Sequence, residues 1–112
     1  MNVAIKRVYE EAAGTDGFRV LVDRVWPRGM TKEKAAIDLW AKNVAPTTAL
    51  RQWFGHDPAK WDEFRERYRE ELKTNPALDE LRATIRDKGK VTLLYGAKDE
   101  EHNQAVVLRQ VL

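Results

Sequence analysis

The chain has 112 residues and a mass of 13.0 kDa, with 20 Lys and Arg, 18 Asp and Glu, two His and no cysteine. This length suits one domain spanning residues 1–112. The absence of cysteine excludes disulfides, thiolate metal sites and a cysteine nucleophile. No stretch approaches the roughly 18 apolar residues of a membrane-spanning helix, and the N-terminus lacks a signal-peptide core, so we expect a cytoplasmic protein.

The formal net charge is only +2, but cations gather in residues 19–34. The five cations of this segment are Arg19, Arg24, Arg28, Lys32 and Lys34. A local excess of this size attracts an anion, but it is small for a nucleic-acid-binding surface. Most of these side chains are expected to belong to a solvated surface of mixed charge.

The first half of the chain contains three predicted strands. Residues 3–9 and 18–24 are rich in β-branched and aromatic side chains, and the apolar run 20–22 indicates burial on both faces of a sheet. The link between these two strands is too short for a helical crossover, which favours an antiparallel arrangement but does not fix it. Thr31 is a candidate cap for a short helix ending at Ile37, and residues 39–44 form a weaker third strand.

The second half is mainly helical. Thr47 or Thr48 caps a short helix, and the pairs Asp57-Pro58 and Asn75-Pro76 each begin a longer one. Gly89 ends the second long helix, and residues 91–95 form a compact apolar strand, expected to be central.

Asp99 and the acidic residues after it predict the start of a final helix that buries Ala105, Leu108 and Leu112. Strands alternating with helices predict an α/β fold. We expect a single three-layer domain, with a small mixed or mostly parallel sheet of about four strands flanked by helices.

Two groups of polar residues follow predicted strands. The first is residues 23–29, Asp-Arg-Val-Trp-Pro-Arg-Gly, at the end of the strand 18–24. Ligands of open α/β sheets bind outside the carboxyl ends of strands, and arginine suits phosphate or carboxylate. Arg24 and Arg28 are therefore candidate ligand-binding residues, and Asp23 is a candidate acid/base. The alternative is a structural Asp–Arg pair that fixes the loop.

The second group begins at the end of the strand 91–95. Gly96 permits a close backbone approach, and a helix start offers N–H groups to an anion. Tyr95, Gly96, Lys98 and Asn103 are the candidate ligand-binding residues, with His102 as a second candidate acid/base. One glycine matches neither a Walker loop nor a dinucleotide fingerprint.

The remaining histidine, His56, is interpreted as a turn residue. No His or Cys spacing indicates a metal site, and no cofactor is expected.

Four segments of the chain resemble the YeaO-like branch of the "domain of unknown function 488" family. The segments are residues 6–9, 21–29, 50–54 and 93–99, and the string Asp-Arg-Val-Trp-Pro-Arg-Gly is the most specific. The resemblance runs over nearly the whole chain, and the family has no agreed activity.

Other branches of that family resemble this chain at Asp23 and at Lys98-Asp99. They carry a cysteine where Tyr95 stands and a Cys-His-Arg cluster where residues 103–105 stand. The resemblance therefore implies that the shared positions hold a ligand, while thiol or metal chemistry does not carry over.

Two functions remain open from the sequence. The first is the binding of an anionic small molecule or nucleotide at the C-terminal ends of the strands, with transfer or hydrolysis at a phosphate or acyl group as the reaction if the protein is an enzyme. The second is a non-enzymatic interaction module that binds nucleic acid or a protein partner through the basic segment 19–34.

Overall fold

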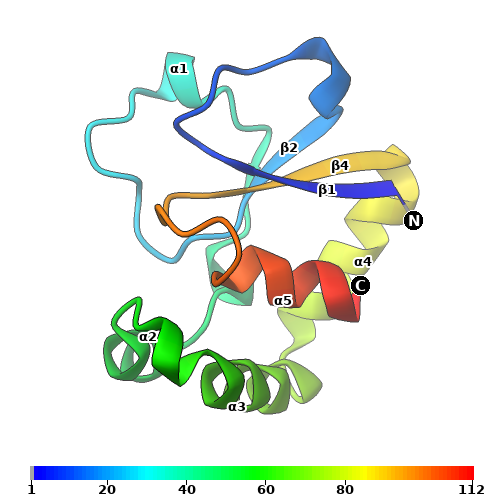
Figure 1. The fold of residues 1–112 in the computed structure, drawn as a ribbon. Coiled ribbons are helices and arrows are strands. Elements are labelled where there is room, and N and C mark those ends of the chain that lie inside the picture. The colour runs from blue at the N-terminus through cyan, green and yellow to red at the C-terminus, as the bar shows by residue number, and fades with distance from the viewer. Residues whose placement is uncertain (1) are drawn as a thin grey trace.

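The computed structural model describes residues 2–112 and shows one four-stranded parallel sheet in the order β1-β4-β2-β3 (Figure 1). The strands are β1 Asn2–Arg7, β2 Phe18–Leu21, β3 Leu39–Trp40 and β4 Lys90–Tyr95. The prediction of an α/β fold with a small, mostly parallel sheet is confirmed. β4 pairs with β1 on one side and β2 on the other, as expected of its apolar sequence.

The favoured antiparallel arrangement of the first two strands is wrong. Both run parallel to β4, which lies between them. The link of residues 8–17 returns across the sheet with only the 3-10 helix Gly14–Asp16 in it. Ten extended residues reach about 33 Å, enough for the return along a strand of about 20 Å and a sideways step of about 10 Å. A parallel crossover therefore needs no long helix here.

Residues 2–112 also form five α-helices: α1 Lys32–Ala35, α2 Thr48–Phe54, α3 Trp61–Lys73, α4 Pro76–Lys88 and α5 Gln104–Val111. Their starts follow the capping side chains. Thr47 accepts a hydrogen bond from the Leu50 N–H at 3.2 Å, and Asn75 accepts one from the Ala77 N–H at 3.0 Å. Each cap satisfies an N–H group that the helix leaves without a partner.

Several predicted boundaries differ from the structure: the strand predicted at 18–24 ends at Leu21, and α3 begins at Trp61, after the 3-10 helix Pro58–Lys60. β3 stops at Trp40 because the chain turns into the 3-10 helix Lys42–Val44. The last helix begins at Gln104 rather than at Asp99, since Asn103 is its cap and accepts from the Val106 N–H at 3.2 Å. Asp99 instead closes the preceding turn by accepting hydrogen bonds from the N–H groups of Glu101 and His102.

The two faces of the sheet are covered differently (Figure 1). Helices α2 to α5 cover one face, and the larger apolar core there includes Phe64, Tyr68 and Leu93. The loop of residues 22–38, with the short α1, covers the other face around Leu21 and Leu94. Among the described residues, no helix combines the length and apolar composition needed to cross a bilayer.

Candidate functional site

A cavity of about 550 Å³ lies where β2 and β4 end. Its walls come from the loop after β2, from α2 and the turn after it, and from the start of α5. The charged and amide side chains that line it are Asp23, Arg24, Arg28, Arg51, Gln52, His56, Asn103 and Gln104. The carboxyl ends of parallel strands are the usual place for a ligand in an open α/β sheet.

Asp23 is fixed in the cavity wall by a hydrogen bond to each carboxylate oxygen. Oδ2 accepts from the Gly96 N–H at 2.9 Å, and Oδ1 accepts from the Gln104 side-chain amide. Burial raises the pKa of Asp23 above its ordinary value, although these bonds and the charge of Arg51 oppose the change. Among residues 2–112, Asp23 forms no ion pair.

Gly96 is required by the close approach of this carboxylate. A Cβ atom at position 96 would lie 2.8 Å from Asp23 Oδ2, closer than side chains tolerate. The absence of a side chain lets the backbone N–H reach the carboxylate. The close approach at Gly96 is thus to a carboxylate of the chain itself, and the role of Gly96 in binding a ligand stays a prediction.

The two predicted arginines of the first group both line the cavity. Arg24 Nε donates to the Pro46 carbonyl at 2.9 Å, and Nη2 donates to the Ala45 carbonyl at 2.9 Å. Part of this guanidinium therefore holds the chain before α2 in place. The Arg28 side chain is exposed at the rim, and its carbonyl accepts from the Tyr9 hydroxyl at 2.8 Å.

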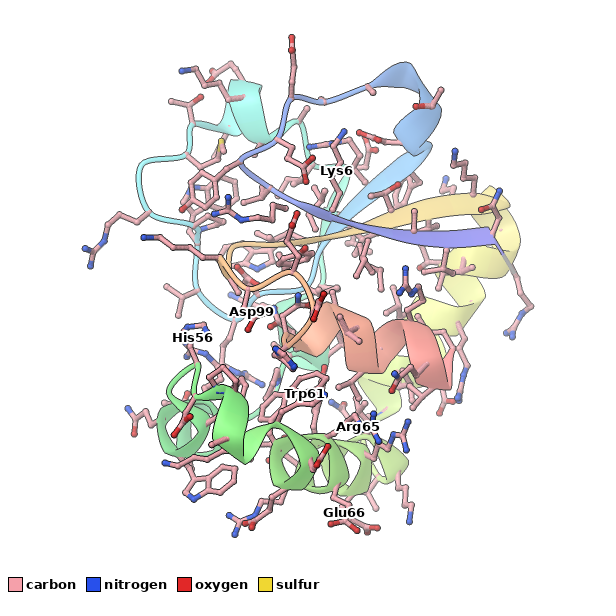
Figure 2. The ribbon with its side chains drawn as sticks, in the orientation of Figure 1. Lys6, His56, Trp61, Arg65, Glu66 and Asp99 are labelled. Carbon is pink, nitrogen blue, oxygen red and sulfur yellow. The ribbon has the colours of Figure 1, made fainter. Side chains whose placement is uncertain are left out.

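Two further cavity residues, Arg51 and His56, were not predicted from the sequence. Arg51 lies on α2, and His56 lies in the turn after it, as predicted, with an unusual φ of 57°. Figure 2 shows His56 rising from the end of α2 toward the loops at the strand ends. A positive φ is uncommon for a residue other than glycine and, when it occurs in a cavity wall, is worth testing for function.

Three of the predicted site residues lie outside the cavity. Tyr95 is only 2% exposed and packs in the larger core, where burial raises the pKa of its hydroxyl. The Lys98 side chain is exposed and does not line the cavity. His102 also lies outside it.

His102 belongs to a separate contact at the end of the turn before α5. Its Nδ1 lies 2.8 Å from Asp99 Oδ2, and its ring meets the Trp61 ring edge-on with centroids 5.2 Å apart. The hydrogen bond with His102 lowers the pKa of the Asp99 carboxyl. Asp23 lines the cavity and His102 lies outside it, so the two candidate catalytic residues do not share a site.

Asn103 lines the cavity but is used by the fold. Only 2% of it is exposed, its Nδ2 donates to the Asp99 carbonyl at 2.9 Å, and its oxygen caps α5. The side-chain amide of Gln104, the next residue in this wall, donates to Asp23 Oδ1.

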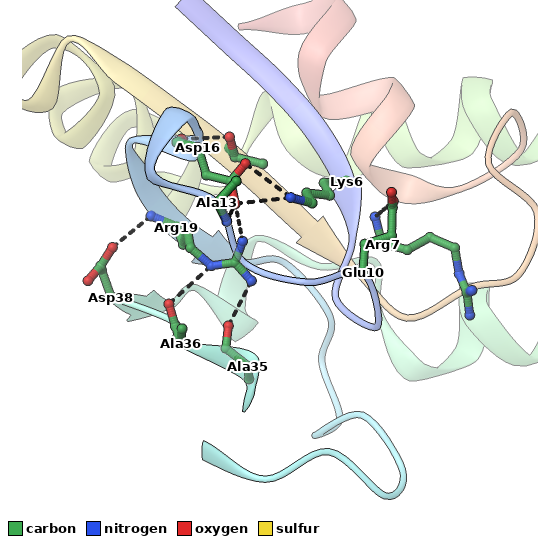
Figure 3. Close-up of polar contacts among 10 residues, drawn as sticks. Lys6, Arg7, Glu10, Ala13, Asp16, Arg19, Ala35, Ala36 and Asp38 are labelled. Carbon is green, nitrogen blue, oxygen red and sulfur yellow. Dashed lines mark hydrogen bonds and ion pairs between the residues drawn. The ribbon is translucent and has the colours of Figure 1, made fainter. Parts of the chain in front are cut away.

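The cations of the basic segment 19–34 do not form one surface, because Arg19 is buried while Arg28, Lys32 and Lys34 are exposed. Arg19 is 4% exposed and pairs with Asp16, and its guanidinium donates to the carbonyls of Ala35 and Ala36 at 2.8 and 3.1 Å (Figure 3). Burial opposes ionisation of Asp16, but hydrogen bonds from Ala13, Lys6 and Arg19 outweigh it and hold the pKa of the Asp16 carboxyl below its ordinary value. Arg19 is a structural residue, and its charge is not presented to a partner.

The described residues form no group of three or more His, Cys, Asp or Glu side chains that could hold a metal ion.

The sequence matches a family model over nearly its whole length. Residues 2–112 match DUF488-N3i, described as the inactive DUF488-N3 subclade. The chain belongs to the DUF488 family. It is 44% identical over 108 residues to the uncharacterised protein YeaO of Escherichia coli K12, covering 96% of this chain and 94% of that protein.

Mycobacterial relatives are similar at nearly the same level. The uncharacterised proteins Rv3073c of Mycobacterium tuberculosis H37Rv and Mb3100c of Mycobacterium bovis are each 43% identical over 111 residues, or 99% of this chain and 93% of the relative. No solved structure matches the chain. The resemblance to the DUF488 family is therefore confirmed, and the relatives' names give no function.

Membership of this family makes the placement of Tyr95 informative. The resemblance implies a cysteine at this position in other branches, and here the position holds a tyrosine in the larger core. Burial raises the pKa of its hydroxyl and so favours the neutral phenol further. Tyr95 contributes packing to the end of β4 and lies outside the cavity.

Proposed function

We propose that this DUF488 protein binds a small anionic molecule in the cavity at the C-terminal ends of β2 and β4. The observation that carries the proposal is the charge of the cavity wall. Among the residues that line it, Arg24, Arg28 and Arg51 are opposed by a single carboxylate, Asp23. Guanidinium groups present paired, planar donors that suit the oxygens of phosphate or carboxylate.

The size and the apolar part of the cavity fit a small organic anion. Its volume of about 550 Å³ lies within the range of about 300–1,000 Å³ usual for ligand pockets. Trp26, Phe54 and Phe64 also line it and offer apolar surface for a ring or carbon chain. A nucleotide is one anion with this combination of groups.

The same geometry favours binding over catalysis. Asp23 and His102, the two candidate acid/base residues, do not meet in the cavity. Of residues 2–112, those lining the cavity include no serine, threonine, cysteine or lysine nucleophile, and no hydrogen bond joins Asp23 to His56, the histidine that lines it. The description of the matching subclade as inactive agrees with a binding role.

The alternative of an interaction module that uses the basic segment 19–34 has less support. Arg19 is buried in a structural ion pair, and Arg24 donates to two backbone carbonyls. The exposed cations of the segment are Arg28, Lys32 and Lys34. These three charges give a small electrostatic footprint for a nucleic acid.

Isothermal titration calorimetry with inorganic phosphate, pyrophosphate and AMP tests the proposal. We expect saturable binding of at least one probe, weakened about tenfold by Arg51→Gln because one charge-assisted contact is lost. Arg86→Gln is the matched control, since it removes the same charge from an exposed position on α4.

Two results would overturn this function. One is the absence of binding for all three probes at millimolar concentration. The other is an equal loss of affinity in Arg51→Gln and Arg86→Gln, which would show attraction to the net charge of the protein rather than to the cavity.

A further inference from the structure

The cavity holds groups of opposite charge that do not neutralise one another. Asp23 and three arginines line the same space, yet within the described part of the chain Asp23 forms no ion pair. Arg24 directs two of its nitrogens at the carbonyls of Ala45 and Pro46 instead. A carboxylate beside cations usually pairs with one of them, so this separation leaves both kinds of group available to a ligand.

The Asp23 carboxylate accepts fewer hydrogen bonds than it can. The Gly96 N–H and the Gln104 amide each occupy one position, on different oxygens. An ionised carboxylate has about four acceptor positions in all. The two existing bonds fix the direction of the carboxylate and leave each oxygen able to accept another hydrogen bond from inside the cavity.

A purely structural role would not need a charge at this position. An asparagine could join the ends of β2 and β4 through the same Gly96 N–H without the cost of desolvating a carboxylate. The position also excludes a side chain at residue 96, where a Cβ would lie 2.8 Å from Oδ2. The fold thus accommodates a half-buried carboxylate that its packing does not require.

We propose that the ligand of this cavity carries, besides its anionic group, a hydroxyl or amino hydrogen-bond donor that Asp23 accepts. The inference rests on the proposed function, because it assigns the anionic group to the arginines. The chemical class is a phosphate ester, or an anion of similar size, with an O–H or N–H group on its carbon part. Inorganic phosphate would leave most of a cavity of about 550 Å³ unfilled.

Matched pairs of phosphate esters test this assignment by calorimetry on the wild-type protein. Glycerol 3-phosphate is compared with propyl phosphate, which lacks its hydroxyls, and phosphoethanolamine is compared with ethyl phosphate, which lacks its amine. We expect the donor-bearing member of at least one pair to bind about tenfold tighter, because a hydrogen bond to a charged acceptor has this effect. The pair that shows the preference identifies the donor as hydroxyl or amine.

The variant Asp23→Asn separates this inference from the proposed function. Its side-chain oxygen can still accept from Gly96, and Gln104 can rotate its amide to accept from the new one. We expect the preference within the pair to disappear while inorganic phosphate binds at least as tightly as to the wild type. A control, Asp79→Asn, removes an exposed carboxylate of α4 and should leave the preference unchanged.

Three outcomes overturn the inference. Equal binding within both pairs refutes the donor while leaving anion binding intact. A preference that survives in Asp23→Asn refutes the role of Asp23. Failure of every ester and of inorganic phosphate to bind removes the proposed function and this inference together.

Discussion

Asp23 and Gly96 are 73 residues apart in the chain and joined by a hydrogen bond of 2.9 Å at the ends of two paired strands. The bond forms because β2 and β4 run parallel and end at the same edge of the sheet. It joins the two groups of residues that the sequence analysis placed after separate strands. The donor is the backbone N–H of residue 96, and a glycine is needed there because a Cβ atom would lie 2.8 Å from Asp23 Oδ2.

Replacing Gly96 by alanine is expected to destabilise the protein by about 1–3 kcal/mol. The added Cβ would lie 2.8 Å from Asp23 Oδ2, and Gln104 restricts the carboxylate from moving away. Urea unfolding of Gly96→Ala against wild type measures this change in the free energy of unfolding.

A double-mutant cycle identifies the cause of that loss. In the Asp23→Ala background the carboxylate is gone, so Gly96→Ala should cost clearly less than in the wild type. The same cost in both backgrounds would place the strain in the backbone rather than in the contact with Asp23.

Asp23→Asn is expected to become more stable relative to wild type as the pH rises. Burial raises the pKa of Asp23 above 3.8, so the folded state favours the protonated acid and loses stability as that acid ionises. The advantage of the amide should begin to grow near pH 3.8 and stop growing above the raised pKa.

Thermal unfolding of both proteins across the acid range measures this difference. Other titrating groups are common to the two proteins and largely cancel in the comparison. A difference in Tm that stays constant with pH would contradict the raised pKa.

The two strands that border the cavity could be predicted from the sequence because they depend on local patterns, although β2 ends at Leu21 rather than at Arg24. The apolar runs before Asp23 and Gly96, followed by polar residues and glycine, indicate strands with polar groups at their carboxyl ends. The capping pair at Asn75 predicted the start of α4 for the same reason, since a cap is formed by neighbouring residues, whereas Asp57 caps the 3-10 helix Pro58–Lys60 that leads into α3. These features needed no knowledge of tertiary structure.

The opposite wall of the cavity could not be predicted in this way. Arg51 and His56 lie on α2 and the turn after it, and only the packing of that helix against the sheet brings them to the strand ends. Tyr95 shows the reverse case. Its polar group suggested a site, but the alternation of side chains along β4 turns it into the larger core.

The variant His56→Asn tests whether the histidine at position 56 serves ligand binding or the backbone conformation of the turn. Its φ of 57° disfavours most side chains, whereas asparagine adopts this region more readily. The variant should therefore unfold at the same temperature as wild type or slightly above it. If the imidazole contacts the anion, the affinity for the best-bound probe should fall severalfold.

Calorimetry measures the affinity of the variant, and thermal unfolding measures its Tm. Asp57→Asn, which keeps a capping side chain at the next position, is the control for local changes in the turn. Unchanged affinity with a raised Tm would mean that His56 has no part in binding.

Arg19→Met is expected to destabilise the protein by about 3–5 kcal/mol, the usual cost of removing one partner of a buried ion pair. Arg19 is 4% exposed and pairs with Asp16, so its loss leaves a buried carboxylate with Lys6 as its remaining cation. It also removes the donors to the carbonyls of Ala35 and Ala36, which hold the end of α1 over the sheet.

The comparison with exposed and conservative variants makes this prediction specific. Lys73→Met breaks an ion pair between Lys73 and Glu70, whose side chains are 67% and 70% exposed, respectively. It should lower the free energy of unfolding by less than about 1 kcal/mol. Arg19→Lys keeps the charge but lacks the fork that reaches two carbonyls, so its loss of stability should lie between those of the other two. Equal losses for Arg19→Met and Lys73→Met in urea unfolding would show that the buried pair does not hold the loop over this face of the sheet.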